Sequence, residues 1–150
     1  MESSWSLAKE WIKNHEGYRS SVYNCSNGYP TIGYGHKIRQ DEEKSSIDEE
    51  EAEELLEQDM QSLCSKVSNH VKNYSDLSSV RQAVLMDMIF NLGEFGFSKF
   101  AKMINALENE KYGEAANEMK DSKWYRETGR RSKHLVDCME NDDAYSPDDY

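Results

Sequence analysis

Hydrophobic and polar positions alternate with a helical period at the start of the chain. The apolar side chains that would share one helix face are Trp5, Leu7, Ala8, Trp11 and Ile12. Ser3 or Ser4 can cap the first turn, because a serine hydroxyl accepts a hydrogen bond from a free backbone N–H group. The pattern stops around residues 15–17, so Glu16 is expected to lie at the end of a helix.

The following segment predicts a small β-hairpin from Val22 to Ile38. It contains a loop rich in Asn, Ser and Gly, where Asn27-Gly28 is the best turn signal, and then the alternating run TIGYGHKI. The second strand is expected to have about five residues. An isolated hairpin is only marginally stable in water, so this one must pack against a helix.

A long helix is expected after a polar linker at 39–45. Ser46 followed by Glu49 is typical of a capping box, and the helix should run through about Val71. Its apolar stripe consists of Ala52, Leu55, Leu56, Met60, Leu63, Val67 and Val71. Asp59 falls on this stripe, where a carboxylate needs a partner because burying an unpaired charge is costly.

The run from Val80 to Leu92 is nearly all apolar, which predicts a helix in the middle of a bundle. Gly93 is expected to end this helix. Shorter helices are expected around 98–107, 112–119 and 130–139. The acidic residues 140–150 are expected to be loosely held, as chain ends often are.

Together these elements predict an α+β fold with two lobes in a single domain, residues 1–150. A hairpin lobe would cover about 16–45, a bridging helix about 46–71 and a helical lobe about 72–140, with the N-terminal helix packed on the helical lobe. A chain of 150 residues can bury a real core. Clefts between lobes are common ligand sites, so the function is expected there.

The formal net charge is −11, with acidic residues concentrated at 41–57 and 137–150. This charge argues against nucleic acid or an anionic membrane as a partner, and the acidic segments are interpreted as solvated surfaces. No apolar stretch reaches the ~18 residues of a membrane span, and the N-terminus lacks the pattern of a secretory signal. A monomer made in the cytoplasm is expected.

The three cysteines, Cys25, Cys64 and Cys138, are an odd number without paired spacing. They suggest neither a disulfide framework nor a metal cage, and no cofactor is expected. A reducing compartment at synthesis is the simplest interpretation.

Candidate chemistry is concentrated in the stretch EGYRSSVYNCSNGYPTIGYGH. Glu16 lies near a helix end, Cys25 lies in a polar loop, and Thr31 begins a strand. A glycosidase needs a carboxylic acid for the leaving oxygen and a polar group that holds a water on the opposite side. Taken alone the stretch is only suggestive, because exposed loops commonly collect such residues.

The order of these residues carries a resemblance. Glu16 is followed nine positions later by Cys25, six positions later by Thr31, and then by Gly-x-Gly-His. This order resembles the phage-type lysozymes of glycoside hydrolase family 24, the family of the T-even phage endolysins. The runs FNLGEFGFSKF and SKWYRETGRRSK resemble the helical lobe of the same enzymes, so the resemblance covers roughly residues 5–145. The family usually has Asp at the position of Cys25.

The resemblance implies hydrolysis of the β-1,4 bond between N-acetylmuramic acid and N-acetylglucosamine in peptidoglycan, with inversion. Glu16 would be the general acid, kept protonated by burial in the cleft, while Cys25 and Thr31 would hold the attacking water. Without the resemblance, Glu16 could be an ordinary exposed carboxylate and Thr31 a plain strand residue.

Further positions match the family. Tyr23, Asn91 and Trp124 match cleft residues, although each could equally be a core or cap residue. Arg131 matches an arginine near the catalytic acid, and a solvated surface base is an equally good interpretation. The family also carries a structural His–Asp pair, here His36 and Asp59; a metal site at His36 is not expected, because no second His stands at ligand spacing.

A second function class remains open: a wall-binding or otherwise repurposed module that keeps the fold and has lost turnover. The replacement of Asp by Cys25 and the acidic surface favour this module. The intact Glu16, Thr31 and Gly-x-Gly-His set favours the enzyme. The enzyme is the preferred hypothesis, with peptidoglycan glycan strands as its partner and release to the wall by a holin or a secretion apparatus.

Overall fold

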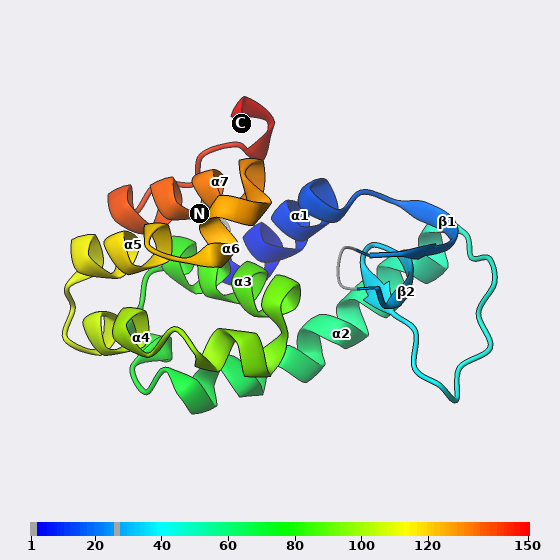
Figure 1. Cartoon of the computed structure of the whole chain (residues 1–150), viewed down its shortest axis with the longest axis horizontal. Coiled ribbons are helices and arrows are strands. Elements are labelled where there is room, and N and C mark those ends of the chain that lie inside the picture. The colour runs from blue at the N-terminus through cyan, green and yellow to red at the C-terminus, as the bar shows by residue number, and fades with distance from the viewer. Residues whose placement is uncertain (1–2, 26–27) are drawn as a thin grey trace.

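A long helix joins a small β-sheet to a group of helices in this computed structural model, which describes residues 3–25 and 28–150 (Figure 1). The elements are α1 (Ser4–Glu16), β1 (Arg19–Asn24), β2 (Pro30–Gly33), β3 (His36–Lys37), α2 (Glu49–His70), α3 (Ser79–Ser98), α4 (Ala101–Glu108), α5 (Tyr112–Lys120), α6 (Lys123–Thr128) and α7 (Arg130–Asn141), with 3₁₀ turns at Tyr74–Asp76 and Pro147–Asp149. The sheet lies at one end of α2 and the helical lobe at the other, so the predicted α+β class is confirmed.

Helix α1 is capped and ended as its sequence predicts. The Ser3 hydroxyl accepts from the backbone N–H of Ser6, and Gly17 ends the helix with a φ of 72°. The apolar face of α1 is buried against α3, with Trp11 and Ile12 almost fully covered. Glu16 is therefore placed by the last turn of a firmly packed helix.

The sheet has three antiparallel strands in the order β1-β2-β3, where a two-stranded hairpin was predicted. Gly33 and Gly35 have φ angles of 67° and 72°, so the chain turns within the run TIGYGHKI and makes two short strands from it. Strand β1 begins at Arg19, earlier than predicted. Asn27 of the predicted Asn27-Gly28 turn lies outside the described residues.

Helix α2 begins at Glu49, and the predicted capping box at Ser46 is wrong. Asp48 caps the helix instead, since its side chain accepts from the Glu51 N–H at 2.8 Å. The backbone at Ser46 bridges to Ser21 at the sheet edge, so this residue is not available to begin a helix. The buried residues of the helix are those of the predicted stripe: Ala52, Leu56, Met60 and Val67.

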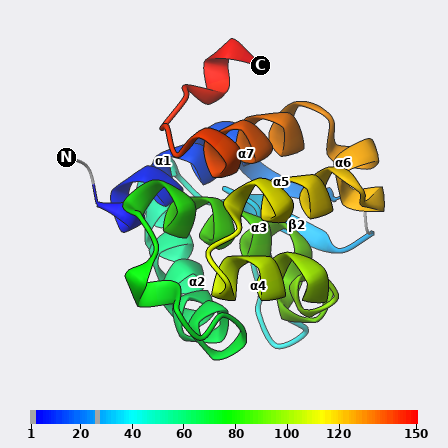
Figure 2. The same cartoon turned by 90° about the vertical axis from the view of Figure 1, so that its left-hand side faces the viewer.

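Helix α3 lies at the centre of the helical lobe and is contacted by α1, α2 and α7 (Figure 2). Gly93 interrupts it with a φ of 76°, as predicted, but helical turns resume and continue to Ser98. Helices α4, α5 and α7 lie close to their predicted ranges. The short helix α6 was not predicted, because six residues are too few to show a hydrophobic period. In the described part of the chain, no helix is both long and apolar enough to cross a membrane.

The C-terminal segment is held in place, and the prediction of a loose tail is wrong. Arg130 donates hydrogen bonds to the carbonyl oxygens of Pro147 and Tyr150, and the Tyr150 hydroxyl donates to Asp137 at 2.7 Å. Pro147 is buried. The segment looks polar in the sequence, yet its backbone oxygens accept hydrogen bonds from the guanidinium of Arg130 on α7.

Candidate active site

Glu16 lies where the helical lobe meets the sheet. Its Oε2 accepts a hydrogen bond from Nη1 of Arg131 at 2.6 Å, and its side chain is 18% exposed. Gly35 covers the opposite side, because a Cβ atom on this glycine would lie 2.7 Å from the carboxyl group. The second glycine of the Gly-x-Gly-His run is thus required by close contact with the carboxylic acid.

Cys25 and Thr31 lie on the sheet side of the same site. Thr31 is opposite Tyr23 in the β1–β2 ladder, and Cys25 follows β1 directly. The Thr31 hydroxyl donates to the carbonyl of Tyr29 at 2.9 Å, and the backbone N–H of Cys25 donates to the same carbonyl at 3.0 Å. A single carbonyl thus holds both candidate water-binding residues in position.

These side chains line one polar pocket of about 340 Å³ between the lobes. Its lining residues are Glu16, Arg19, Tyr23, Asn24, Cys25, Thr31, Gly35, Lys37, Phe90, Asn91 and Arg131. Burial raises the pKa of the Tyr23 hydroxyl, and the nearby Glu16 adds to this effect, so Tyr23 is a neutral hydrogen-bonding group here. The pocket brings together six residues that the sequence singled out: Glu16, Tyr23, Cys25, Thr31, Asn91 and Arg131.

Trp124 lies outside this pocket. Its indole Nε1 donates to the Asn91 side-chain oxygen at 2.7 Å, and its ring packs edge-on against Phe100. Trp124 therefore orients the amide of Asn91 from behind, which leaves the Asn91 nitrogen as a donor for a ligand.

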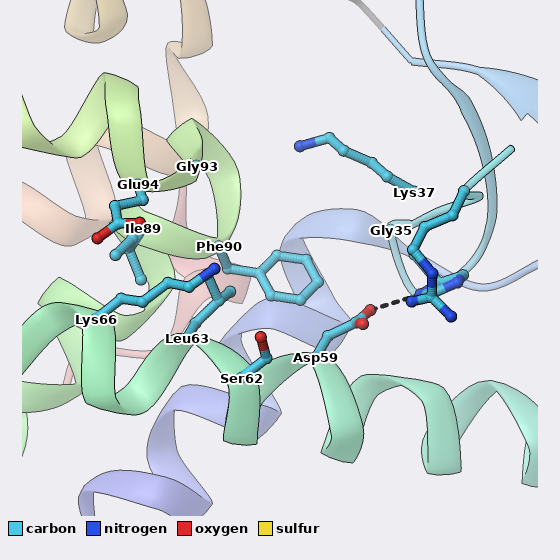
Figure 3. Close-up of a pocket in the computed structure, with 12 residues that line it drawn as sticks. Gly35, Lys37, Asp59, Ser62, Leu63, Lys66, Ile89, Phe90, Gly93 and Glu94 are labelled. Carbon is cyan, nitrogen blue, oxygen red and sulfur yellow. Dashed lines mark hydrogen bonds and ion pairs between the residues drawn. The ribbon is translucent and has the colours of Figure 1, made fainter.

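A second pocket, of about 260 Å³, adjoins the first and shares Gly35, Lys37 and Phe90 with it. It lies between β3 and the helices α2 and α3, and Figure 3 shows the Phe90 ring reaching between these two walls. Lys66 and Lys37 extend from opposite walls. The two pockets therefore meet at these three shared residues.

Arg131, which donates to Glu16, is itself held by the buried carboxylate of Asp87, a residue that the sequence analysis missed. Arg131 donates from Nε to Asp87 Oδ1 at 2.7 Å, and His15 Nδ1 lies 2.8 Å from the other oxygen of Asp87. Burial opposes ionisation of the fully buried Asp87, but Arg131 and His15 outweigh it and hold the pKa of this carboxyl below its usual range. The available signal for this buried carboxylate was that Asp87 is a charged residue within the apolar run of α3.

Residues 13–140 match the phage lysozyme family. The chain belongs to this family. The lysozyme-family chain is 29% identical, over 90% of its length, to "Probable T4-type lysozyme 2" of Dictyostelium discoideum, of which it covers 94%. It is 31% identical over 87% of its length to the endolysin of Bacillus phage B103, covering 49% of that protein. It is also 30% identical over 85% of its length to the pre-baseplate central spike protein Gp5 of Enterobacteria phage T4, covering 26% of that protein.

In this phage lysozyme family member, His36 ties the sheet to α2. Its Nδ1 lies 2.8 Å from Asp59 Oδ2, and its Nε2 lies 3.1 Å from a Glu42 oxygen. The hydrogen bond with Asp59 raises the pKa of His36 against the effect of burial, and Glu42 adds to the rise. Burial works against Glu42 ionising, yet the Arg39 N–H and His36 lower its pKa. Among the described residues, no group of three His, Cys, Asp or Glu side chains is arranged to hold a metal ion.

We expect Asp59→Asn to destabilise the protein most in mildly acidic solution. Asp59 raises the pKa of His36, so its contribution to stability is fully present below the ordinary histidine value of ~6.5 and is lost as the pH rises through the raised pKa of the folded protein. The loss should be about 1–3 kcal/mol there and shrink above the raised pKa of His36. Urea unfolding at about pH 5.5 and about pH 8.5 measures it, and equal losses at both would contradict this account.

Proposed function

We propose that the protein is a muramidase that hydrolyses the β-1,4 bond between N-acetylmuramic acid and N-acetylglucosamine of peptidoglycan. The observation that supports the proposal is that Glu16, Cys25 and Thr31 line one pocket between the lobes. A carboxylic acid facing a water-holding pair across a sugar-sized cleft is the arrangement that an inverting glycosidase needs. Membership of the phage lysozyme family supports the same substrate class.

Glu16 would protonate the leaving glycosidic oxygen. Its Oε2 is occupied by Arg131, so Oε1 is the oxygen that can carry the transferable proton. Arg131 binds Glu16 on one side of its guanidinium and Asp87 on the other, so the guanidinium is fixed and can orient the carboxyl group of Glu16.

Thr31 and Cys25 would place the attacking water. The Thr31 hydroxyl uses its proton on the Tyr29 carbonyl, so toward the cleft it can only accept a hydrogen bond. A water that donates to Thr31 keeps a lone pair free to attack the anomeric carbon. The half-buried thiol of Cys25 can accept or donate a second, weaker hydrogen bond and fix the direction of that lone pair.

The second candidate function is a wall-binding module without turnover, and Cys25 together with the net charge of −11 favours it. For either function we propose synthesis in the cytoplasm, a monomeric state, and release to the wall by a holin or a secretion apparatus.

Digestion of purified peptidoglycan sacculi, followed by borohydride reduction and mass spectrometry of the fragments, separates these possibilities. A muramidase generates new reducing ends that appear as reduced N-acetylmuramic acid. Reduced N-acetylglucosamine ends would reassign the cleaved bond. Sedimentation of the protein with sacculi that gain no reducing ends would instead support the binding module.

A further inference from the structure

A chain of buried polar groups continues from Glu16 through the helical lobe to the C-terminal segment. Beyond Asp87 and His15, the Nε2 of His15 lies 3.1 Å from Nδ1 of His134, and the Nε2 of His134 lies 2.7 Å from the carbonyl oxygen of Tyr145. The side chains of His15 and Asp87 have no exposed surface, and His134 is also fully buried. Helices α1, α3 and α7 each contribute to this chain.

The hydrogen bonds determine how many protons the two imidazoles hold. A backbone carbonyl can only accept, so Nε2 of His134 must carry a proton. Asp87 is ionised beside Arg131 and also can only accept, so Nδ1 of His15 must carry one. The contact between the two rings needs a further proton, on one nitrogen or the other.

The two rings together thus hold three protons, whereas two neutral imidazoles hold two. The third proton gives the pair one positive charge. The groups around the two rings determine which ring carries this positive charge. Burial lowers the pKa of His134, the Tyr145 carbonyl and the Asp87 charge oppose this, and the charges of His15 and Arg130 reinforce it. The edges of the Trp11 and Tyr150 rings complete its surroundings. His15, in direct contact with Asp87, is the favoured carrier.

We propose that His15 and His134 share one excess proton at neutral pH, and that this cationic pair and Asp87 form a positioning unit that holds Arg131 against Glu16. Asp87 is then flanked by a positive charge on each side, which keeps it ionised without solvent. Its two oxygens fix both the guanidinium and the imidazole. The proton count concerns the fold alone, while the effect on Glu16 rests on the proposed function.

Asp87→Asn tests the unit because an amide has one acceptor oxygen where the carboxylate has two. The amide oxygen can accept from Arg131 or from His15. If it accepts from His15, the contact that holds Arg131 loosens; if it accepts from Arg131, the amide NH2 faces His15 Nδ1, which must then give up its proton. Removal of the negative charge also leaves Arg131 to act on Glu16 alone, which favours the ionised form of this acid. We expect kcat to fall between about 10-fold and 100-fold with KM nearly unchanged, and activity to decline at a lower pH on the alkaline side.

Asp137→Asn is the matched control. Asp137 lies on α7, as Arg131 does, and accepts a hydrogen bond from Tyr150, but it is not part of the buried chain. The variant removes the same charge and should keep the wild-type kcat and pH profile. Equal effects of the two substitutions, or an Asp87→Asn profile that keeps its alkaline limb, would overturn the role of Asp87 as a positioning residue.

Nitrogen-15 NMR of histidine-labelled protein tests the proton count without any activity assay. With the ring signals assigned to residues, we expect that at pH 7 one imidazole of the His15–His134 pair carries protons on both ring nitrogens and the other is neutral. His36 is also buried and has a raised pKa, so its signals are assigned separately and not counted. Two neutral rings in the His15–His134 pair of the wild-type protein would overturn the proposal, whether or not Asp87→Asn folds. A muramidase assay that fails on wild-type protein would remove the proposed function and leave the NMR result interpretable.

Discussion

Replacing Glu16 by Gln is expected to reduce the hydrolysis of peptidoglycan by about 10²–10⁴-fold, because general acid catalysis supplies that much of the rate. Gln keeps the shape of the side chain and can still accept from Arg131, but it cannot give a proton to the leaving oxygen. Initial rates of turbidity loss on chloroform-permeabilised Gram-negative cells measure the effect.

The fold should tolerate this substitution. Arg131 retains its bond to Asp87 and can donate to the side-chain oxygen of Gln as it does to Glu16, so the melting temperature should stay nearly unchanged. Glu57→Gln, on α2 and bonded to Trp5, is the control and should retain full activity. A Glu16→Gln variant that keeps a quarter of wild-type lysis would remove Glu16 from the mechanism.

Replacing Cys25 by Ala is expected to abolish most activity, whereas Cys25→Asp should remain active with its pH optimum moved downward. Alanine cannot hydrogen-bond to the attacking water. Thr31 would then hold this water alone, and the direction of its lone pair would no longer be fixed. An ordinary aspartate titrates near ~3.9 and an ordinary thiol near ~8.5, so Asp at this position works as a base in more acidic solution. The pH dependence of kcat/KM for both variants checks this expectation.

Alkylation gives an independent readout of Cys25. A thiol reagent should inactivate the wild-type enzyme, and bound glycan fragments should protect it. Cys64→Ala is the control, because Cys64 lies on α2 away from the pocket and its removal should change neither activity nor inactivation. Full activity of Cys25→Ala would contradict the water-placing role.

The sequence predicts those parts of the fold whose signals are local. The apolar stripes of α1 and α2 and the break at Gly93 are read from neighbouring residues, and the structure has them. A single strand of about five residues was predicted in the run TIGYGHKI, because alternation alone does not show that its two glycines adopt positive φ. The C-terminal segment was missed for a related reason, since its partner Arg130 is a tertiary contact.

The candidate site divides in the same way. Glu16, Cys25 and Thr31 stand in an ordered motif, and the structure lines one pocket with them. The partners His15, Asp87 and Arg131 are separated by long stretches of chain, and they meet because α1 and α7 both pack on α3. No periodicity in the sequence encodes that meeting, although a lone aspartate in an apolar helix indicates that a buried partner exists.

The stereochemistry of the first product tests the central claim most directly. Proton NMR of soluble glycan strands, recorded immediately after enzyme is added, resolves the anomers of the new N-acetylmuramic acid end before they equilibrate. Attack by a water placed by Cys25 and Thr31, opposite Glu16, predicts the α-anomer as first product. The β-anomer as first product, or a glycosyl adduct on Cys25 in mass spectrometry, would show a covalent thiolate mechanism with retention and contradict this account.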